Sequence, residues 1–500
     1  MSTVHLDQLL LGIADTAVAA HHGASRIAVS GLTLDSRRVR RGDAFFALSG
    51  TRSHGIEFAA DAIRRGAQVV LAEAPAMDTT LDVPVLWVEG LRDQVSEIAA
   101  RFYARPAEAM RVIGITGTNG KTSCVQLLAQ ALTSLGHRAA SIGTLGAGLH
   151  GRLREGERTT PDAVSVQQLL AQFREADVSH VVMEVSSHAL EQARVAAVDF
   201  EVAAFTNLTR DHLDYHGSME AYAAAKARLF AWPGLQSAVV NVDDAFGAAL
   251  ATRFPAEMQR LRFSIADGGD ADVVASEIVT SAQGISFHLR SPWGSRRLHS
   301  RLLGRFNVAN LLVVAGCLGA LGESFEGMMA ALENLQPVSG RMSRLGGIDG
   351  LPLLVVDYAH TPDALEQALT ALRAHCAGRL ICVFGCGGER DSGKRPLMGA
   401  IAARLADQAI VTDDNPRGED GDAIVAQILA GVNASPTVTV ERDRAAAITR
   451  ALALAQTGDV VLVAGKGHET YQEDGRGKHP FDDLAVARAA LGRIAPEVRG

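Results

Sequence analysis

A glycine-rich segment after a hydrophobic stretch is the first place where the sequence could do chemistry. Residues 112–115 predict a buried strand, and residues 116–122 read Thr-Gly-Thr-Asn-Gly-Lys-Thr before an amphipathic helical stretch. Glycines let backbone N–H groups surround phosphate oxygens, and the start of a helix adds positive potential. Lys121 can neutralise the outer phosphates, and Thr122 can bind Mg²⁺. The segment therefore predicts an ATP site made of Gly117, Thr118, Asn119, Gly120, Lys121 and Thr122.

This loop departs from the strict phosphate-loop pattern at one position. That pattern has a glycine five residues before Gly120, where this chain has Ile115. A glycine-rich turn without a ligand is the alternative. The lysine and the threonine that follow favour a nucleotide site.

Two more polar side chains follow predicted strands. Glu184 stands near the end of a strand expected at residues 180–185, which is where ligand groups collect in an open α/β sheet. Carboxylate oxygens suit Mg²⁺, so Glu184 is the best metal ligand, and a carboxylate bonded to backbone N–H groups is the alternative. His212 follows another strand and is, by itself, better interpreted as a capping residue than as a ligand.

An acidic pair beside an arginine follows a strand in the last third of the chain. Residues 413–417 read Asp-Asp-Asn-Pro-Arg, and an aspartate next to an arginine on a turn can bind a zwitterion. The alternative is a turn in which the two charges pair with each other. Glycine loops at residues 387–391 and 465–469 also follow strand ends, and glycine there allows close approach to a ligand. Cys386, which has no paired base beside it, is expected to be passive.

The composition is that of a folded protein with several domains. The chain has 500 residues, with 47% hydrophobic and 21% charged residues, and a single core does not grow to that size. The formal net charge of -8 argues against a nucleic-acid partner. No apolar run is long enough for membrane insertion and no secretory signal begins the chain, so we expect a cytoplasmic protein. Five scattered cysteines predict reduced, buried thiols.

Short aliphatic runs alternate with amphipathic helical stretches from about residue 110 onward. This alternation is typical of parallel sheets with crossover helices and predicts an α/β fold. Strands are expected at residues 112–116, 180–185, 202–207, 238–241, 353–357, 380–385, 408–412 and 459–464. Breaks near residues 105–106 and 336–340 predict three domains, at residues 1–108, 109–338 and 339–500.

Several motifs in a fixed order resemble those of the Mur ligases and their folate-polyglutamating relatives. The loop at residues 116–122 has their form, and the resemblance covers nearly the whole chain. It extends to Glu-Val-Ser-Ser-His (184–188), Asn-Leu-Thr-Arg-Asp-His-Leu-Asp (207–214), Gly-Arg-Phe-Asn (304–307) with Asn310, Ser-Gly-Arg (339–341) and Asp-Tyr-Ala-His-Thr-Pro-Asp (357–363). The resemblance implies a small N-terminal α/β domain, a central P-loop-type mononucleotide-binding domain and a C-terminal Rossmann-like domain.

The resemblance also implies roles in the ATP and metal sites. Lys226, otherwise interpreted as a solvated helix residue, matches a family lysine that is carbamylated by CO2. The implied catalytic residues are Lys121, Glu184, His212 and Lys226, and the implied Mg²⁺ ligands are Thr122, Glu184, His212 and the Lys226 carbamate. Further ATP contacts would be Asn307, Arg341, Asp357 and His360. Ser343 departs from the pattern, because many relatives have a glutamate at that position.

Substrate contacts are implied in the same way. Contacts with a UDP-linked muramoyl dipeptide would come from Leu34, Ser36, Thr51, Arg52 and Ser53 in the first domain, and from Thr159, Thr160, Ser186, Gln192 and Arg194 in the second. Contacts with diaminopimelate would come from Arg390, Asp414, Asn415, Pro416, Arg417, Gly465 and Glu469. In the diaminopimelate-adding members, the arginine that matches Arg417 contacts the distal carboxylate, which lysine lacks.

The resulting expectation is a monomeric, ATP-dependent ligase of peptidoglycan synthesis. It would add meso-diaminopimelate to UDP-N-acetylmuramoyl-L-alanyl-D-glutamate through an acyl phosphate, because a carboxylate must be activated before an amine can attack it. A lysine-adding ligase is the first alternative, which Arg417 disfavours, and a folate polyglutamating enzyme is disfavoured by the extra N-terminal domain. A switch that binds ATP without ligation is the alternative from another class of protein.

Overall fold

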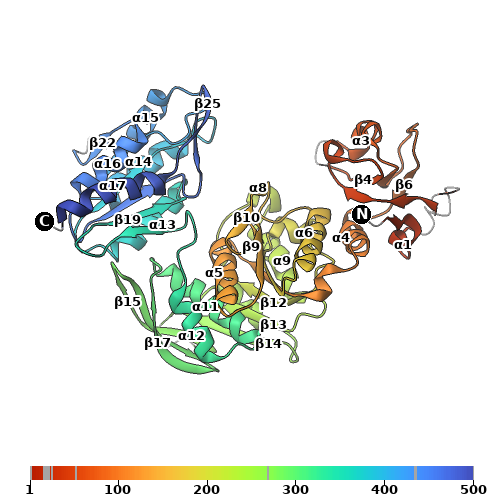
Figure 1. Ribbon diagram of the computed structural model, residues 1–500, viewed down its shortest axis with the longest axis horizontal. Coiled ribbons are helices and arrows are strands. Elements are labelled where there is room, and N and C mark those ends of the chain that lie inside the picture. Colours follow the sequence, from red (N-terminus) through yellow and green to blue (C-terminus); the bar gives the residue numbers. More distant parts are fainter. Residues whose placement is uncertain are drawn as a thin grey trace. The chain divides into compact units, whose positions relative to one another are not determined.

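The computed structural model describes residues 3–14, 23, 26–50, 53–266, 270–432 and 436–498. The chain divides into two compact units, Met1–Phe263 with Gly316–Glu323 and Ser264–Ala315 with Ser324–Gly500. Both units contain parallel sheets with helices between successive strands, which confirms the α/β fold (Figure 1). The domain boundaries near residues 108 and 338 stay a prediction.

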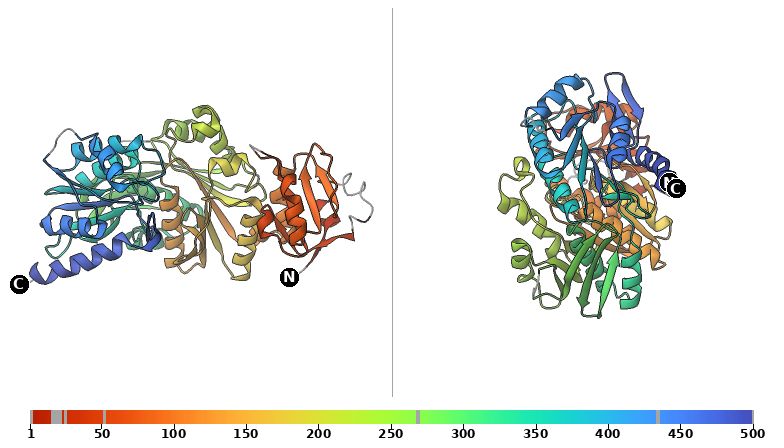
Figure 2. Two further views of the ribbon diagram at one scale, coloured as in Figure 1. Left: turned by 90° about the horizontal axis from the view of Figure 1, so that it is seen from above. Right: turned by 90° about the vertical axis from the view of Figure 1, so that its left-hand side faces the viewer.

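A small parallel sheet forms in the first part of the chain, red and orange in Figure 2. Its strands pair in the order β3 (Gly31–Thr33), β4 (Asp43–Ala47), β5 (Val69–Glu73) and β6 (Val85–Val88). Beside it are the pair β1 (Val4–His5) and β2 (Ala28–Val29), the helices α1 (Leu6–Leu10), α3 (Ala59–Arg65) and α4 (Leu91–Phe102), and 3-10 turns at Ser36–Arg38 and Gly55–Phe58. Every residue of β4 is buried, because α3 and α4 contribute to separate cores on its two faces.

The central sheet of the first unit is parallel over six strands and carries the phosphate loop. In spatial order it consists of β10 (Arg152–Arg154), β9 (Gly146–Leu149), β8 (Ala139–Gly143), β11 (His180–Glu184), β7 (Arg111–Thr116), β12 (Phe200–Phe205), β13 (Ser237–Asn241) and β14 (Gln259–Ser264), of which β9 and β10 are antiparallel. Its helices are α5 (Lys121–Ser134), α6 (Ala163–Glu175), α7 (Ser187–Glu191), α8 (Leu213–His216), α9 (Met219–Ala227) and α10 (Ala245–Ala251), with 3-10 turns at Pro106–Ala109 and Arg228–Ala231.

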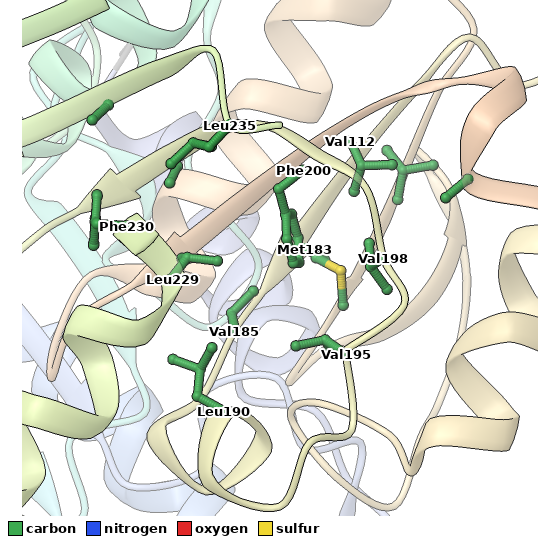
Figure 3. Close-up of a cluster of buried hydrophobic side chains, with 14 of the residues drawn as sticks. Val112, Met183, Val185, Leu190, Val195, Val198, Phe200, Leu229, Phe230 and Leu235 are labelled. Atoms are coloured by element: carbon green, nitrogen blue, oxygen red, sulfur yellow. The ribbon is translucent and has the colours of Figure 1, made fainter. Parts of the chain in front are cut away.

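One face of the central sheet holds a large hydrophobic core (Figure 3). Val112 and Met183 from neighbouring strands lie in it with Phe200, and Leu229 and Leu235 follow α9 in the chain. The strands are hydrophobic without interruption because helices cover both faces of a parallel sheet. This packing fixes the strand ends from which the polar loops emerge.

The second unit begins with an antiparallel ribbon. Its strands are β15 (Val273–Ser281), β16 (Gly284–Ser291) and β17 (Gly294–Ser300), and α11 (Phe306–Ala320) and α12 (Phe325–Asn334) follow.

None of the helices in the described ranges is long and apolar enough to cross a membrane.

A second parallel sheet dominates this unit. Its spatial order is β18 (Ser343–Gly346), β19 (Leu353–Asp357), β23 (Val460–Ala464), β20 (Leu380–Phe384), β21 (Gln408–Val411) and β22 (Val438–Val440), with only β18 antiparallel to its neighbour. The helices are α13 (Pro362–Arg373), α14 (Lys394–Leu405), α15 (Gly421–Leu429), α16 (Arg444–Leu454) and α17 (Asp483–Val498), and β24 (Tyr471–Asp474) pairs with β25 (Gly477–Pro480) in a hairpin. Helices α13, α14 and α15 pack on one face and α16 and α17 on the other.

The strands expected from the sequence are all present, with ends that differ by at most two residues. Thr361 caps α13 by accepting a hydrogen bond from the Ala364 N–H, and Pro362 is the first helical residue. Polar loops therefore follow β7, β11, β12, β21 and β23 at the carboxyl edges of the two sheets.

A buried histidine lies at the opposite edge of the central sheet. His180 is the first residue of β11 and is 4% exposed, and its ring centre lies 4.4 Å from that of His137. Its Nδ1 is 2.9 Å from the Ser179 hydroxyl. Burial, and then the charge of His137, lowers the pKa of His180 to about 4.

We expect acid to destabilise the protein through His180. The unfolded chain takes up this proton near pH 6.5 and the native chain near pH 4, so the free energy of unfolding falls as the pH drops from about 6.5 toward about 4. His180→Gln removes this titration, and its melting temperature should therefore fall less than that of the wild type. Thermal denaturation across that pH range measures the difference, and equal losses would show that His180 carries no such effect.

Candidate active site

The phosphate loop at residues 116–122 lies between β7 and α5. Gly117 has a φ of +145° and Gly120 a φ of +86°, a region that favours glycine. A Cβ atom on Gly117 would lie 1.9 Å from Oγ1 of Thr206, so no side chain fits there. The order of strand, loop and helix N-terminus is the one in which backbone N–H groups and the helix dipole bind phosphate.

The loop after β12 holds the phosphate loop in place. Thr206 Oγ1 donates to the carbonyl oxygen of Asn119 at 2.6 Å, and the Asn119 N–H donates to Asn207 Oδ1 at 2.9 Å. Lys121 Nζ donates to two carbonyl oxygens of the loop, both at 2.8 Å. The ammonium group of Lys121 therefore lies at the place where a triphosphate needs a cation.

Thr122 and Glu184 are brought together as a pair of hard oxygen donors. Thr122 Oγ1 donates to Glu184 Oε2 at 3.0 Å, and the Thr144 N–H donates to Glu184 Oε1 at 2.7 Å. Burial raises the pKa of Glu184, while the charge of Lys121 and these hydrogen bonds act against the rise. A buried carboxylate beside a hydroxyl gains from a divalent cation, so the pair fits Mg²⁺.

Gly143, the last residue of β8, leaves the space that this carboxylate fills. A Cβ atom on Gly143 would lie 2.3 Å from Glu184 Oε1. Gly143→Ala should push the carboxylate away from Thr122 and lower kcat about tenfold to a hundredfold, because a displacement of about 1 Å at a reacting centre costs that much. Phosphate release and a thermal melt test this, with Gly492→Ala at an open helix position as the control. An unchanged kcat in Gly143→Ala would contradict the role given to Glu184.

Lys226 is buried, so the interpretation as a solvated helix residue is wrong. It is 1% exposed, and its Nζ donates to the Gly117 carbonyl oxygen at 2.7 Å and lies 4.3 Å from the centre of the Tyr222 ring. Burial, and then the charge of Lys121, lowers the pKa of Lys226 to about 6. The amine is therefore largely uncharged at neutral pH, which is the form that reacts with CO2.

His212 lies among other aromatic rings, and its side chain is 48% exposed. Its ring centre is 4.9 Å from that of His188, and its Nε2 is 3.5 Å from Asp211 Oδ2. In the described ranges, no group of three or more His, Cys, Asp or Glu side chains is arranged to hold a metal ion. A Mg²⁺ site that uses a threonine, a carboxylate and phosphate oxygens does not need such a group.

Residues expected at the muramoyl dipeptide form a network beside Glu184. Thr160 Oγ1 donates to the Glu184 carbonyl oxygen at 2.7 Å and accepts a hydrogen bond from the Ser186 N–H at 3.1 Å. The hydroxyl of Thr159 lies 3.0 Å from that of Thr144, which also contacts the Glu184 carboxylate. The network joins the pair of Thr122 and Glu184 to residues 159–160.

Arg194 belongs to the same network. It donates to the Thr160 carbonyl oxygen at 2.9 Å and to Gln192 Oε1 at 2.6 and 3.0 Å. Burial lowers the pKa of Arg194. The three hydrogen bonds hold its guanidinium group in one orientation, near the other residues expected at the muramoyl dipeptide.

A cleft of about 1920 Å³ lies within the first unit. Leu34, Ser36 and Ser53 line it, which brings together three residues expected at the UDP group. Arg152, Arg154 and Arg158 line it too, among equal numbers of basic and acidic side chains, and their guanidinium groups suit a diphosphate. Thr51 and Arg52, also expected there, lie outside the described residues.

Ser343, the departure from the family pattern, has a structural role. Its Oγ accepts a hydrogen bond from the Gly340 N–H at 3.0 Å and donates to the Val338 carbonyl oxygen at 3.1 Å. These bonds close the turn that carries Arg341, whose guanidinium carbon lies 5.3 Å from the centre of the Tyr358 ring. A glutamate is not needed at this position to form the turn.

Three of the four further ATP contacts expected in the second unit gather near this turn. Asp357 accepts hydrogen bonds from the N–H groups of Met342 at 2.8 Å and Ala359 at 2.9 Å, and burial raises its pKa. His360 Nδ1 lies 2.8 Å from the carbonyl oxygen two residues earlier. Asn307, in the first turn of α11, donates from Nδ2 to the carbonyl oxygen four residues earlier at 2.7 Å.

The segment at residues 413–417 has its charged partners outside the turn. Asp413 pairs with Arg442 at 2.6 Å, and Arg417 pairs with Glu473 of β24 at 3.4 Å. Arg417 also donates to the Gly388 carbonyl oxygen at 2.7 Å. The alternative in which an aspartate and the arginine of this turn merely pair with each other is therefore not what the structure shows.

This segment is one of three loops that lie close together, at residues 387–391, 413–417 and 465–469. A Cβ atom on Gly388 would lie 1.9 Å from the Pro416 carbonyl oxygen, and one on Gly465 would lie 3.2 Å from Asp414 Oδ2, so glycine permits both approaches. The structure thus brings together Asp414, Asn415, Pro416, Arg417, Gly465 and Glu469 of the expected amino-acid site. Arg390 is exposed on the third loop, where it donates to the carbonyl oxygen one residue earlier.

Three residues that complete these sites were not predicted from the sequence. Thr144 contacts Glu184, and Tyr222 contacts Thr118. No local pattern in the sequence marks either residue. Lys466 is 0% exposed and bonds to Asn415 and Glu469. Its signal was available, since a lysine flanked by glycines at a strand end indicates close backbone approach.

The surroundings of Cys386 agree with the prediction of a passive thiol. It is buried, its Sγ lies 3.6 Å from Met398 Sδ, and burial raises the pKa of the thiol to about 12. The five cysteines are free thiols and only Cys376 is partly exposed.

The fold and the site at residues 116–122 define a mononucleotide-binding α/β protein. The phosphate loop of this site contacts the buried carboxylate of Glu184 through Thr122. Comparison with known proteins is more specific, and the chain belongs to the Mur ligase family. Residues 28–103 match the model of the "Mur ligase family, catalytic domain", residues 115–318 the "Mur ligase middle domain", and residues 340–467 the "Mur ligase, glutamate ligase domain". The resemblance found in the sequence is confirmed.

Individual relatives are similar over almost their whole length. The UDP-N-acetylmuramoyl-L-alanyl-D-glutamate--2,6-diaminopimelate ligase of Xanthomonas campestris pv. campestris is 55% identical over 94% of this chain and 95% of its own. The protein of the same name from Xylella fastidiosa is 53% identical over 95% of this chain and 96% of its own. A solved structure with that name is 37% identical, covers 98% of this chain and 99% of its own, and has a TM-score of 0.74.

Proposed function

We propose that this chain joins meso-diaminopimelate to UDP-N-acetylmuramoyl-L-alanyl-D-glutamate, with conversion of ATP to ADP and phosphate, in peptidoglycan precursor synthesis. The observation that carries the proposal is the 55% identity over 94% of the chain to a ligase named for these substrates. The phosphate loop and the charged loops around residues 413–417 support it, because the reaction needs one site for a triphosphate and another for an amino acid.

The reaction begins with activation of the acceptor. The γ-carboxylate of the D-glutamate attacks the γ-phosphorus of ATP, which forms an acyl phosphate and releases ADP; the amine of diaminopimelate then displaces phosphate and loses a proton. Lys121 neutralises charge that develops on the transferred phosphoryl group. Arg194, held by Gln192 and Thr160, orients the acceptor carboxylate.

Thr122, Glu184, His212 and a carbamylated Lys226 would hold Mg²⁺. When bound, the metal ion screens the repulsion between carboxylate and triphosphate, and the carbamate supplies an anionic oxygen ligand. The contact between Thr122 and Glu184 supports the first pair of ligands. The buried, largely uncharged amine of Lys226 supports its modification, because only that form reacts with CO2.

Arg417 and Asp414 would bind the distal end of diaminopimelate. A guanidinium group binds a carboxylate with two parallel hydrogen bonds, and a buried carboxylate binds an ammonium group. Lysine has the distal ammonium group but no carboxylate there, so Arg417 favours diaminopimelate. The site is completed by Arg390, Asn415, Pro416, Gly465 and Glu469.

We also propose that the enzyme is a cytoplasmic monomer that acts on small molecules.

The test is phosphate release by purified protein with ATP, Mg²⁺ and the UDP-dipeptide, with diaminopimelate or lysine added in parallel. Phosphate should appear only when acceptor and diaminopimelate are both present, and ¹⁸O from the acceptor carboxylate should appear in it. Phosphate release without an amino acid would favour a nucleotide-dependent switch. Equal use of lysine would contradict the assignment of Arg417.

A further inference from the structure

We propose that Lys466 is a positioning residue of the amino-acid site, a buried cation that joins two loops and sets the contacts made with the distal ammonium group. The inference rests on the proposed function, since it gives Asp414, Asn415 and Glu469 to that site. Lys466 itself does not touch the amino acid. It acts through these three residues.

Lys466 is enclosed by acceptor groups. It is fully buried, and its Nζ donates to Asn415 Oδ1 at 2.9 Å and to Glu469 Oε2 at 3.3 Å and lies 3.6 Å from Asp414 Oδ1. A buried ammonium group is costly unless opposite charges and hydrogen bonds compensate for lost water. This arrangement supplies two carboxylates and an amide oxygen.

The backbone around Lys466 is shaped for this placement. Gly465 has a φ of +120° and Gly467 a φ of +55°, so the lysine stands between two residues in conformations that favour glycine. A Cβ atom on Gly467 would lie 2.7 Å from the Cβ of Tyr358. The loop after β23 therefore presses against its neighbours, and Lys466 points to the loop after β21.

Asn415 shows how one cation orders the site. Its Oδ1 accepts hydrogen bonds from Lys466 and from the Glu473 N–H at 3.0 Å, and its Nδ2 donates to Glu469 Oε2 at 2.9 Å. All three partners require the same orientation of the amide. Loss of Lys466 removes a donor and leaves the carboxylates of Asp414 and Glu469 to repel each other.

The charge that remains identifies the group this site would take. Lys466 contributes one positive charge and Asp414 and Glu469 one negative charge each, which leaves one negative charge in excess. Asp414 is more than nine-tenths buried, and within the described residues its Oδ1 accepts no hydrogen bond. A buried carboxylate oxygen without a donor, in a cluster of three side chains that together carry a negative charge, fits an ammonium group.

The experiment compares Lys466→Met and Lys466→Arg with Arg379→Met. Arg379 pairs with Asp459 at 2.7 Å just before β20 and β23 begin, and its side chain donates to Asp459 and Leu454, away from the three loops, so it controls for loss of a partly buried cation. KM for diaminopimelate should rise about thirtyfold or more in Lys466→Met, because a buried charge loses its partner. KM for ATP and kcat should change little. Lysine can be measured as a competitive inhibitor. Its inhibition constant should rise by the same factor as the KM for diaminopimelate, since both amino acids carry the distal ammonium group.

Lys466→Arg keeps the charge and should restore part of the affinity. Equal KM changes for all substrates, or a Lys466→Met variant that behaves like Arg379→Met, would overturn the proposal. Hydrogen exchange in the ligand-free protein provides a measurement independent of the reaction: residues 413–417 should exchange faster in both Lys466 variants than in the wild type. If wild-type protein released no phosphate in response to diaminopimelate, the proposed function would be contradicted. Unchanged hydrogen exchange at residues 413–417 in the Lys466 variants would contradict the role of Lys466.

Discussion

Lys226→Ala should lower kcat by about a hundredfold to a thousandfold, the loss typical of removing one preorganised electrostatic group from an active site. The Nζ of Lys226 lies 2.7 Å from the Gly117 carbonyl oxygen, so any group attached to it lies at the phosphate loop. The KM for diaminopimelate should change little, because that amino acid is assigned to other loops. Steady-state phosphate release measures both constants.

Chemical rescue distinguishes a carbamate from a simple lysine. Acetate or propionate added to Lys226→Ala should restore part of kcat, because a small carboxylate can occupy the space that the side chain leaves. ¹³C-labelled bicarbonate should give a carbamate carbonyl resonance in the wild type and none in the variant. Lys478→Ala, at an exposed hairpin position, is the control. Full activity of Lys226→Ala, or a labelled resonance that survives in it, would show that Lys226 is not the modified residue.

The sequence predicted the elements that carry the sites because their signals are local. Residues 112–122 contain an uninterrupted apolar strand, glycines and a helix start, and each of these depends only on neighbouring residues. Thr361 and Pro362 mark the start of α13 in the same way. Packing between parallel strands then requires that the loops after β7, β11 and β12 meet at one edge.

Burial of polar side chains could not be predicted in this way. Lys226 lies in an alanine-rich helical segment, one turn after Tyr222, and nothing near it in the sequence indicates that its Nζ will reach the Gly117 carbonyl oxygen, 109 positions earlier. The pairing of Arg417 with Glu473 joins residues 56 positions apart, and Lys466 finds Asn415 across 51 positions. Such contacts depend on which strands become neighbours. For Lys226 the family resemblance supplied the expected role. For Lys466 only the flanking glycines gave a signal, and they indicate close backbone approach, not a bond to Asn415.

Arg417→Ala should lower kcat/KM for diaminopimelate about a hundredfold or more, because a buried carboxylate of the substrate would lose its charged partner. Glu473, which pairs with Arg417 at 3.4 Å, would then stand opposite that carboxylate and add repulsion. For lysine the change should be small, since lysine has no distal carboxylate to lose. The ratio of kcat/KM for the two amino acids therefore measures what Arg417 contributes to specificity.

Arg417→Lys sharpens this test, because it keeps the positive charge and removes the two-point hydrogen bonding of the guanidinium group. We expect it to recover only part of the discrimination. Arg476→Ala is the matched control, since Arg476 lies on the same hairpin as Glu473, is 84% exposed and pairs with Asp474. A loss of activity in Arg417→Ala that is equal for diaminopimelate and lysine would mean that the arginine holds the loops together instead of recognising the distal carboxylate. The Gly388 carbonyl oxygen, which accepts a hydrogen bond from Arg417, would then be its important partner.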